Sequence, residues 1–310
     1  MSALAWLARN GRWVLPAGLI TGIAIPPLAR AFEPLIVPLI AALLFLAALR
    51  IGPDAARPRA REVPGALLLT GALQLAAPLA AIALFAALGW LGHPVALGVV
   101  LVLAAAPITG SPGLAILTGA DPAPALRQLV LGTALLPLTA LPVFALLPVF
   151  ADPGQTLAAA LRLMAIVALA GGGGFLLRWL VPRLAGPQAA VGIDGLTALG
   201  MGLVVIGLTS AIGPAILALD PLLWLCLAAV FALNFGSQIV AWSLLRAGGA
   251  GPRAPPLAIV AGNRNLALFL GALPPETVQA LLLFVGCYQI PMFLTPLLLS
   301  GLYRRGLARL

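Results

Sequence analysis

The sequence predicts an all-α integral membrane protein with ten transmembrane helices, arranged as two inverted repeats of five helices. The composition is the first reason, because 62% of the 310 residues are hydrophobic and only 8% are charged. The mean hydropathy of +1.14 is the second. A soluble domain could not bury that much apolar surface, whereas apolar segments of about 20 residues can cross a bilayer as helices. We therefore expect the lipid bilayer to be a partner of the whole chain.

Windows of about 20 apolar residues divide the chain into ten predicted spans. Their expected bounds are 13–30, 33–50, 64–90, 93–120, 124–150, 156–181, 190–212, 219–246, 254–273 and 277–303. Residues 1–310 would form a single transmembrane domain, with one repeat at about 13–150 and the other at about 156–303. Because each repeat holds an odd number of spans, the second repeat would run upside down relative to the first.

The basic residues orient the predicted spans. All of them are arginine, and the net charge is +9. If the chain has ten spans, most of them lie on one side of the membrane, before the first span, in alternate loops or after the last span: Arg9, Arg12, Arg50, Arg57, Arg59, Arg61, Arg127, Arg178, Arg183, Arg246, Arg253, Arg304, Arg305 and Arg309. The positive-inside rule then places both termini in the cytoplasm and the chain in the inner (plasma) membrane. In a membrane protein this basic excess reports topology, so we expect no nucleic-acid partner.

A polar interruption in span 9 is the most informative stretch of the chain. Gly262 is followed by Asn263, Arg264 and Asn265 inside an otherwise apolar segment. An arginine in a bilayer costs several kcal/mol or more unless it faces a cavity, an ion or a ligand. Gly262 is a place where a helix can break, and a broken helix exposes backbone groups that can bind solutes.

Span 4 holds a similar stretch. Residues 110–122 lie over residues 262–274 without a gap, and six positions agree, among them Gly110 with Gly262 and Pro122 with Pro274. Further along, Gly132, Pro137 and Pro142 have the same spacing as Gly286, Pro291 and Pro296. Matched interruptions are expected in transporters built from inverted repeats, so spans 4 and 9 are predicted to be broken crossing helices. Chance is the competing explanation, because Gly, Ala, Leu and Pro dominate the chain.

The ten spans, the two interrupted helices and the spacing of Gly262 and Asn265 resemble the bile acid:sodium symporter family, in a divergent bacterial-type form. Sodium-coupled members typically have Glu-Thr-Gly-Met-Gln-Asn in span 9. The corresponding residues here are Val260, Ala261, Gly262, Asn263, Arg264 and Asn265. In span 4 the family typically has Pro-Gly-Gly-Thr-Ala-Ser-Asn, of which this chain keeps only Pro107.

The resemblance implies a secondary transporter that moves an organic anion by alternating access, with a panel-like bundle rocking against a core of spans 3–5 and 8–10. It also implies roles for particular residues. Gln74 and Thr133 look like sodium contacts of the family, and Gln289, after Tyr288, looks like part of a polar pair that faces the substrate.

Two departures from the family pattern make sodium dependence doubtful. Val260 and Arg264 stand where the family has a glutamate and a glutamine that help to coordinate sodium. A guanidinium would repel the ion, by about 4 kcal/mol at 4 Å and an effective dielectric of 20. We therefore hypothesise that Arg264 supplies the positive charge permanently and favours a small carboxylate or sulfonate. Further hydrogen bonds to that anion would come from four polar residues near Arg264: Asn263, Asn265, Thr109 and Ser111.

Other interpretations of these polar residues stay open. Arg264 could form a structural bridge to Gln74 or to exposed carbonyls of a broken helix. Sodium coupling could persist through Gln74, Thr133 and backbone carbonyls. Asp194 could relay protons, pair with Arg264 or sit at the entry of span 7, while Asn234 and Gln238 could line a cavity or link helices.

We expect no enzyme, no catalytic residues, no cofactor and no metal centre. An intramembrane aspartyl protease needs two embedded aspartates, and Asp194 is the one candidate. A serine hydrolase would need His93, the sole histidine, and no aspartate-rich magnesium motif is present. A channel is a further alternative, which saturation and counterflow of transport would distinguish from a carrier.

Overall fold

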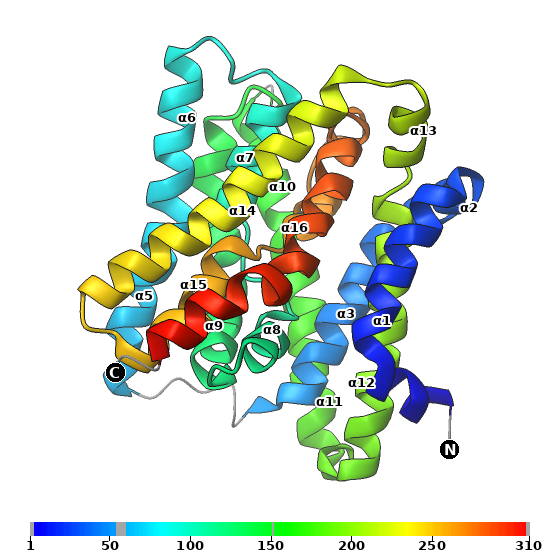
Figure 1. Ribbon diagram of the computed structural model, residues 1–310, viewed down its shortest axis with the longest axis vertical. Coiled ribbons are helices and arrows are strands. Elements are labelled where there is room, and N and C mark those ends of the chain that lie inside the picture. Colours follow the sequence, from blue (N-terminus) through cyan, green and yellow to red (C-terminus); the bar gives the residue numbers. More distant parts are fainter. Residues whose placement is uncertain (1–2, 54–59, 151, 308–310) are drawn as a thin grey trace. The chain divides into compact units, whose positions relative to one another are not determined.

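The computed structural model describes residues 3–53, 60–150 and 152–307 (Figure 1). Over these residues the protein is helical and contains no β-sheet; a single isolated bridge pairs Pro107 with Arg264. Arg57, Arg59 and Arg309, which we used to orient the chain, lie outside the described residues. The predicted all-α class is therefore confirmed for the described part of the chain.

Seven of the described helical segments are long and apolar enough to cross a membrane. They are Pro26–Ile51, Ala60–Ala87, Pro122–Ala145, Pro153–Leu180, Pro187–Leu217, Pro221–Ala247 and Pro275–Arg304. Each corresponds to one of the ten predicted spans, so the protein is a helical multi-pass membrane protein. The other three predicted spans contain shorter helices: Trp13–Ala24 and Pro94–Ala104 are shorter apolar helices, and residues 254–273 are divided.

The chain divides into two compact units. The first comprises Met1–Arg57, Leu161–Leu223 and Ala267–Gln289, and the second comprises Pro58–Ala160, Trp224–Leu266 and Ile290–Leu310. Each unit therefore draws on both of the predicted repeats. The long helix α16 (Pro275–Leu307) passes from the first unit to the second between Gln289 and Ile290. This boundary lies beside Pro291, whose missing N–H interrupts the helical hydrogen bonds.

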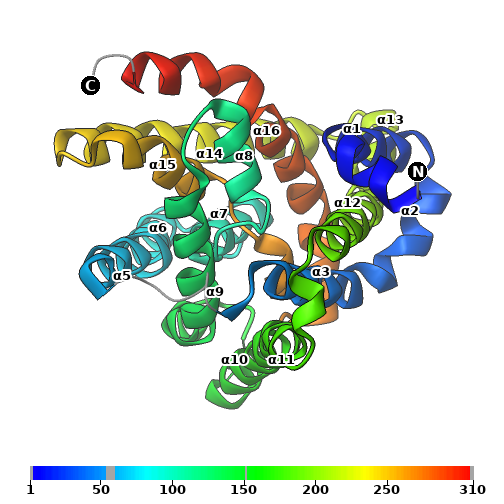
Figure 2. The ribbon, with the colours of Figure 1, turned by 90° about the horizontal axis from the view of Figure 1, so that it is seen from below.

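In the first unit, α1 (Ala3–Ala24) and α12 (Pro187–Leu208) run side by side (Figures 1 and 2). Glycines allow this close approach, because a Cβ built on Gly18 would lie 2.6 Å from the carbonyl oxygen of Gly202. The unit also contains α2 (Pro26–Phe32), η1 (Glu33–Leu35), α3 (Ile36–Ile51), η4 (Val167–Gly172), α11 (Gly173–Leu180), η5 (Pro182–Ala185) and α13 (Ile212–Leu217).

The second unit holds the predicted broken span 4 and the first part of span 9, up to Leu266. It contains η2 (Ala60–Glu62), α5 (Val63–Gly71), the π-helical turn η3 (Ala72–Ala76), α6 (Ala77–Ala87), α7 (Pro94–Ala104), α8 (Ser111–Thr118), α9 (Pro122–Ala145), most of α14 (Pro221–Ala247), η6 (Gly251–Arg253), α15 (Ala254–Gly262) and the end of α16. Helix α10 (Pro153–Ile166) contributes to both units. Helix α14 and the end of α16 lie side by side (Figures 1 and 2).

Several helices begin where a polar residue precedes a proline. Asp121 and Asp220 accept hydrogen bonds from the second residue beyond each, at 3.0 and 2.9 Å, and His93 Nδ1 accepts from Val95 at 3.2 Å. A proline in the first helical position needs no N–H partner, and the polar side chain satisfies a donor of the first turn. This pattern explains why acidic residues and His93 stand at the ends of apolar segments.

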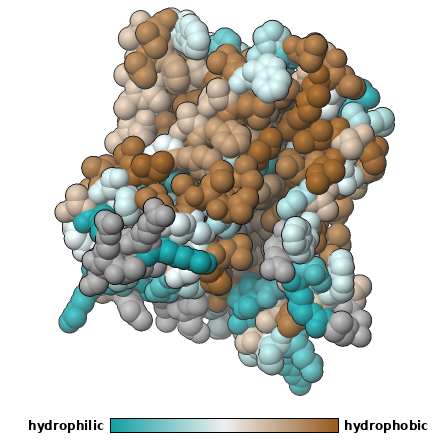
Figure 3. All heavy atoms as spheres, in the orientation of Figure 1, coloured by the Kyte–Doolittle hydropathy of each residue, from teal (hydrophilic) through white to brown (hydrophobic). Residues whose placement is uncertain are grey.

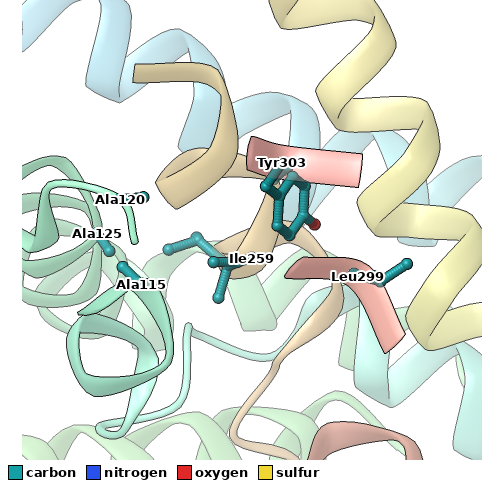
Figure 4. Packing of buried hydrophobic residues seen from close by; sticks show 8 residues of the cluster. Ala115, Ala120, Ala125, Ile259, Leu299 and Tyr303 are labelled. Carbon is teal, nitrogen blue, oxygen red and sulfur yellow. The ribbon is translucent and has the colours of Figure 1, made fainter. Parts of the chain in front are cut away.

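The packing of the second unit centres on a small apolar cluster. Ala115 of α8, Ile259 of α15, and Leu299 and Tyr303 of α16 belong to it (Figure 4). Helix α14 presents other apolar side chains outward, including Trp224, Val240 and Leu244, and Figure 3 shows hydrophobic side chains gathered over this helix. Exposed apolar surface of this kind is what a helix in contact with lipid requires.

Candidate functional site

Two extended segments of the second unit pair where helices are interrupted. Helix α7 ends at Ala104 and α8 begins at Ser111, while α15 ends at Gly262 and η7 (Leu266–Gly271) follows. Ile108 N donates to Asn263 O at 2.9 Å, and Asn265 N donates to Ala106 O at 2.7 Å. We call residues 105–110 and 263–265 together the crossing.

The first interruption does not lie where the self-comparison of the sequence placed it. The alignment of Gly110 with Gly262 would place the first break at residues 110–113, but the structure leaves residues 105–110 outside helices and begins α8 at Ser111. The reason is local. Pro107 cannot donate to the carbonyl of Leu103, so the helix ends before it, whereas Pro112 in the first turn of α8 is compatible with a helix start.

Arg264 occupies the centre of the crossing and is buried, with 3% of its surface exposed. Its Nη2 donates to the carbonyl of Leu103 at 2.8 Å and to the carbonyl of Leu73 at 3.1 Å. The arginine therefore connects the end of α7 with the π-helical turn η3, which lies far away in the sequence.

Prolines explain why these two carbonyls accept from Arg264. The helical partner of Leu103 would be Pro107, four residues on, which has no N–H. In η3, Ala77 N–H donates to Ala72 O, five residues back, so the corresponding partner of Leu73 would be Pro78, which again has no N–H. A buried carbonyl without a donor is unfavourable, and the guanidinium of Arg264 supplies donors to both.

The ends of two helices also favour a positive charge at the crossing. Both α7 and α15 reach it by their C-terminal ends, at Ala104 and Gly262. The C-terminal end of a helix carries a partial negative charge that stabilises cations within the last turn. In the described structure, Arg264 supplies a positive charge at this position.

Gln74 and Gly132 connect η3 with α9 beside the crossing. Gln74 Nε2 donates to Gly132 O at 3.1 Å, and Gln74 Oε1 accepts from Thr139 Oγ1 at 2.9 Å. A Cβ on Gly132 would lie 2.9 Å from Pro107 Cδ, so glycine is required for α9 to approach the crossing. Thr133, the next residue on α9, is buried as well.

A buried polar network holds the other side of the crossing to α14. Asn234 Nδ2 donates to Gly262 O at 2.6 Å and to Asn263 Oδ1 at 3.3 Å. Gln238 Nε2 donates to Asn234 Oδ1 at 2.7 Å. We considered that Asn234 and Gln238 could line a cavity or link helices. The structure shows the second, because their hydrogen bonds link α14 to the crossing.

Helix α16 completes this network with two residues that sequence reasoning missed. Thr295 Oγ1 lies 3.3 Å from Asn263 Oδ1, and Tyr303 O–H donates to Gln238 Oε1 at 3.0 Å. Figure 4 shows the hydroxyl of Tyr303 directed away from the labelled alanines. A signal was present, because Thr295 and Tyr303 are polar residues in a long apolar segment, two helical turns apart.

The structure places most of the predicted site residues in the second unit. These are Arg264, Asn263, Asn265, Thr109, Ser111, Gln74 and Thr133. Ser111 is fully buried at the start of α8, while Thr109 and Asn265 are half-buried. Val260 lies within α15 in the apolar cluster.

Two other residues of interest belong to the first unit. Gln289 Nε2 donates to the carbonyl of Val285, one turn earlier in its own helix, at 3.1 Å. Asp194 pairs with Arg50, whose Nε lies 2.8 Å from Asp194 Oδ1. Asp194 therefore pairs with Arg50, at the end of α3, and not with Arg264, the partner that we considered from the sequence.

No family model matches the chain, and no match is found among curated proteins. Among the described residues, no three His, Cys, Asp or Glu side chains form a group that could hold a metal ion.

Proposed function

We propose that the protein is a secondary transporter that moves a small organic anion by alternating access and resembles the bile acid:sodium symporters. The observation that carries the proposal is the crossing. Two interrupted helices pair through extended backbone, and a buried arginine lies at the pairing. Interrupted helices near the middle of a bilayer are the usual substrate and ion sites of transporters built from inverted repeats.

The ten-span topology and the inverted repeats belong to this proposal. Support comes from α9 and α16, which follow the two interruptions and carry glycine and prolines at matching spacing. Gly132 of α9 and Gly286 of α16 each lie where another element passes closely: a Cβ there would lie 2.8 Å from Gln74 Nε2 and 2.6 Å from Leu208 O, respectively. In this proposal both termini face the cytoplasm.

We further propose that Arg264 replaces a coupling sodium. The C-terminal ends of α7 and α15 favour a cation at the crossing, and a covalently attached guanidinium meets this preference at any sodium concentration. A fixed positive charge in turn favours an anionic substrate such as a carboxylate or a sulfonate. Since Arg264 is 3% exposed in this conformation, the substrate would reach it only in another state of the transport cycle.

The sodium-coupled alternative has weaker support. It assigns sodium contacts to Gln74 and Thr133, but the Gln74 carbonyl oxygen already accepts from Thr139, and the Gln74 amide nitrogen donates to Gly132. Sodium needs several oxygen ligands, and the glutamate of the family motif is Val260 here, which packs in the apolar cluster. The carrier proposal also stands ahead of an enzyme, because the crossing offers hydrogen bonds and charge but no paired nucleophile and base.

A stability screen followed by a transport assay tests the proposal. The purified protein is heated with bile acids, short carboxylates and sulfonates, once in sodium and once in potassium buffer. The best ligand is then followed into proteoliposomes, where a carrier shows saturation and counterflow. We expect stabilisation and counterflow by one anion to be equal in both salts.

Variants of Arg264 make this test specific. Arg264→Gln should abolish stabilisation by the anion, whereas Arg264→Lys should retain part of it, because lysine keeps the charge without the planar donor geometry. The matched control is Arg162→Gln, an exposed arginine of α10 in the first unit. Binding that needs sodium would contradict sodium independence, and equal binding by wild type and Arg264→Gln would contradict the role of Arg264.

A further inference from the structure

A cluster of three arginines lies away from the crossing, at a pocket of about 280 Å³ in the second unit. Its lining comes from the start of α5, the start of α9, the end of α14 and the start of α15. The charged residues in this lining are Arg61, Glu62, Arg127 and Arg253. The proposed transport function makes no use of this pocket.

The pocket carries an excess of positive charge. Glu62 Oε2 lies 2.8 Å from Arg127 Nε, and Glu62 Oε1 lies 3.3 Å from Arg253 Nη2. One carboxylate therefore faces two guanidinium groups, and Arg61 adds a third at the rim. The side chain of Arg253 is 59% exposed, so it is accessible to a ligand from outside.

Helix starts add to this charge. Gly65 and Ala66 belong to the first turn of α5, Pro124 belongs to the first turn of α9, and Arg253 immediately precedes α15. The N-terminal end of a helix carries a partial positive charge that favours anions nearby. Three helix starts and three arginines thus surround one small space.

The polar Gln128 also lines the pocket, and leucines supply much of its apolar lining. Leu69, Leu131, Leu245 and Leu257 contribute to it, one each from α5, α9, α14 and α15. The charged residues lie at the ends of apolar segments, since Arg61 and Glu62 begin the candidate span Ala60–Ala87 and Arg127 lies near the start of Pro122–Ala145. The pocket therefore has charged residues at the ends of the spans and leucines further along them. An amphiphile at the membrane surface has the matching arrangement, with a charged head and apolar chains.

We propose that this pocket binds the phosphate headgroup of an anionic phospholipid. The arginines and helix starts bind the phosphate, and the leucines contact the glycerol and the first methylene groups of the acyl chains. Basic pockets between transmembrane helices are known binding sites for such headgroups. The leucines and the position at the span ends favour a lipid over free inorganic phosphate, which shares the phosphate chemistry but has no apolar part.

Glu62 acts in this site as an internal competitor for the phosphate. Its carboxylate contacts two of the arginines that the headgroup would contact, so binding requires Arg127 or Arg253 to exchange one anion for another. Removing the negative charge of Glu62 should therefore strengthen lipid binding. This expectation is opposite in sign to what a purely structural ion pair predicts.

Native mass spectrometry of the full chain in a neutral detergent tests the proposal. The probes are dioleoylphosphatidylglycerol, dioleoylphosphatidylcholine with the same acyl chains, and inorganic phosphate. We expect the wild type to retain phosphatidylglycerol in preference to phosphatidylcholine. The double variant Arg127→Gln/Arg253→Gln should bind it about 25-fold more weakly, at about fivefold for each arginine lost.

Two further variants separate the site from general charge effects. The control Arg30→Gln/Arg162→Gln removes two exposed arginines of the first unit and should leave the preference for phosphatidylglycerol unchanged. Glu62→Gln should bind phosphatidylglycerol more tightly than the wild type, which provides a test even if the double variant does not fold. The proposal is overturned by equal retention of the two lipids, by equal loss in both double variants, by weaker binding to Glu62→Gln, or by displacement of the lipid by equimolar inorganic phosphate.

Discussion

Arg264 at the crossing and Arg127 beside the pocket belong to the same compact unit, but their charged groups are stabilised in different ways. The guanidinium of Arg264 is buried and donates to two backbone carbonyls whose helical partners are prolines. The guanidinium of Arg127 retains 20% of its side-chain exposure and pairs with the carboxylate of Glu62. The hydrogen bonds of Arg264 thus complete the pairing of the backbone at the crossing. The ion pair of Arg127 is partly exposed, so the carboxylate of Glu62 can be exchanged for another anion.

This difference has an energetic consequence. Removing a buried donor leaves carbonyls that no water can reach, whereas removing a partner from a partly exposed ion pair leaves a group that water can solvate. The two regions therefore should respond to substitution with very different losses of stability.

Arg264→Met should lower the free energy of unfolding by about 2–6 kcal/mol, because the carbonyls of Leu73 and Leu103 each lose a donor at about 1–3 kcal/mol. Denaturation of the purified protein in mixed micelles measures this loss. Arg162→Met is the matched control, since Arg162 is exposed, and it should change stability by no more than about 0.5 kcal/mol. Equal effects of the two substitutions would mean that the carbonyls of the crossing do not depend on Arg264.

Gly262→Ala tests how tightly the crossing is held against α14. A Cβ at this position would lie 2.2 Å from the carbonyl oxygen of Asn234, which is backbone and cannot rotate away. We expect a loss of about 1–3 kcal/mol in the same unfolding assay, as for other overpacked interiors. Gly236→Ala on α14 is the control, because a Cβ there meets nothing within 4 Å, and it should be stabilising by about 0.5–1 kcal/mol. A neutral Gly262→Ala would show that α14 and α15 can separate at little cost.

Glu62→Gln should have a small effect on stability, at most about 1 kcal/mol, because its ion pairs are partly exposed. The loss should also shrink as salt is raised to about 1 M, where the screening length falls to about 3 Å. Asp194→Asn, which breaks the more exposed pair with Arg50, should cost less still. A salt-independent loss as large as that of Arg264→Met would show that the pocket, like the crossing, is a fixed part of the architecture.

Composition and hydropathy were sufficient to predict a multi-pass helical membrane protein, because apolar helices of bilayer length have a strong signal. They were also sufficient to single out Gly262 and Arg264, since polarity inside an apolar segment is costly and therefore visible. The boundaries of the interruptions were less predictable. The self-comparison aligned Gly110 with Gly262, while the structure begins the first break at Ala105, because Pro107 ends α7 at that point.

Exposed carbonyls of a broken helix were among the partners considered for Arg264, but the particular carbonyls could not be predicted from the chain. The two acceptors of Arg264 lie 161 and 191 residues away in the sequence. The sequence alone does not show which buried carbonyls come within hydrogen-bonding distance of the guanidinium. The sequence shows that Pro78 and Pro107 have no backbone N–H, but only packing brings the carbonyls they leave unpaired to one guanidinium. The pocket at Arg127 has the same origin, since three helix starts from separate segments have to meet before their charges add. Local polarity and length are properties of a segment, whereas the pairing of distant groups arises from tertiary structure.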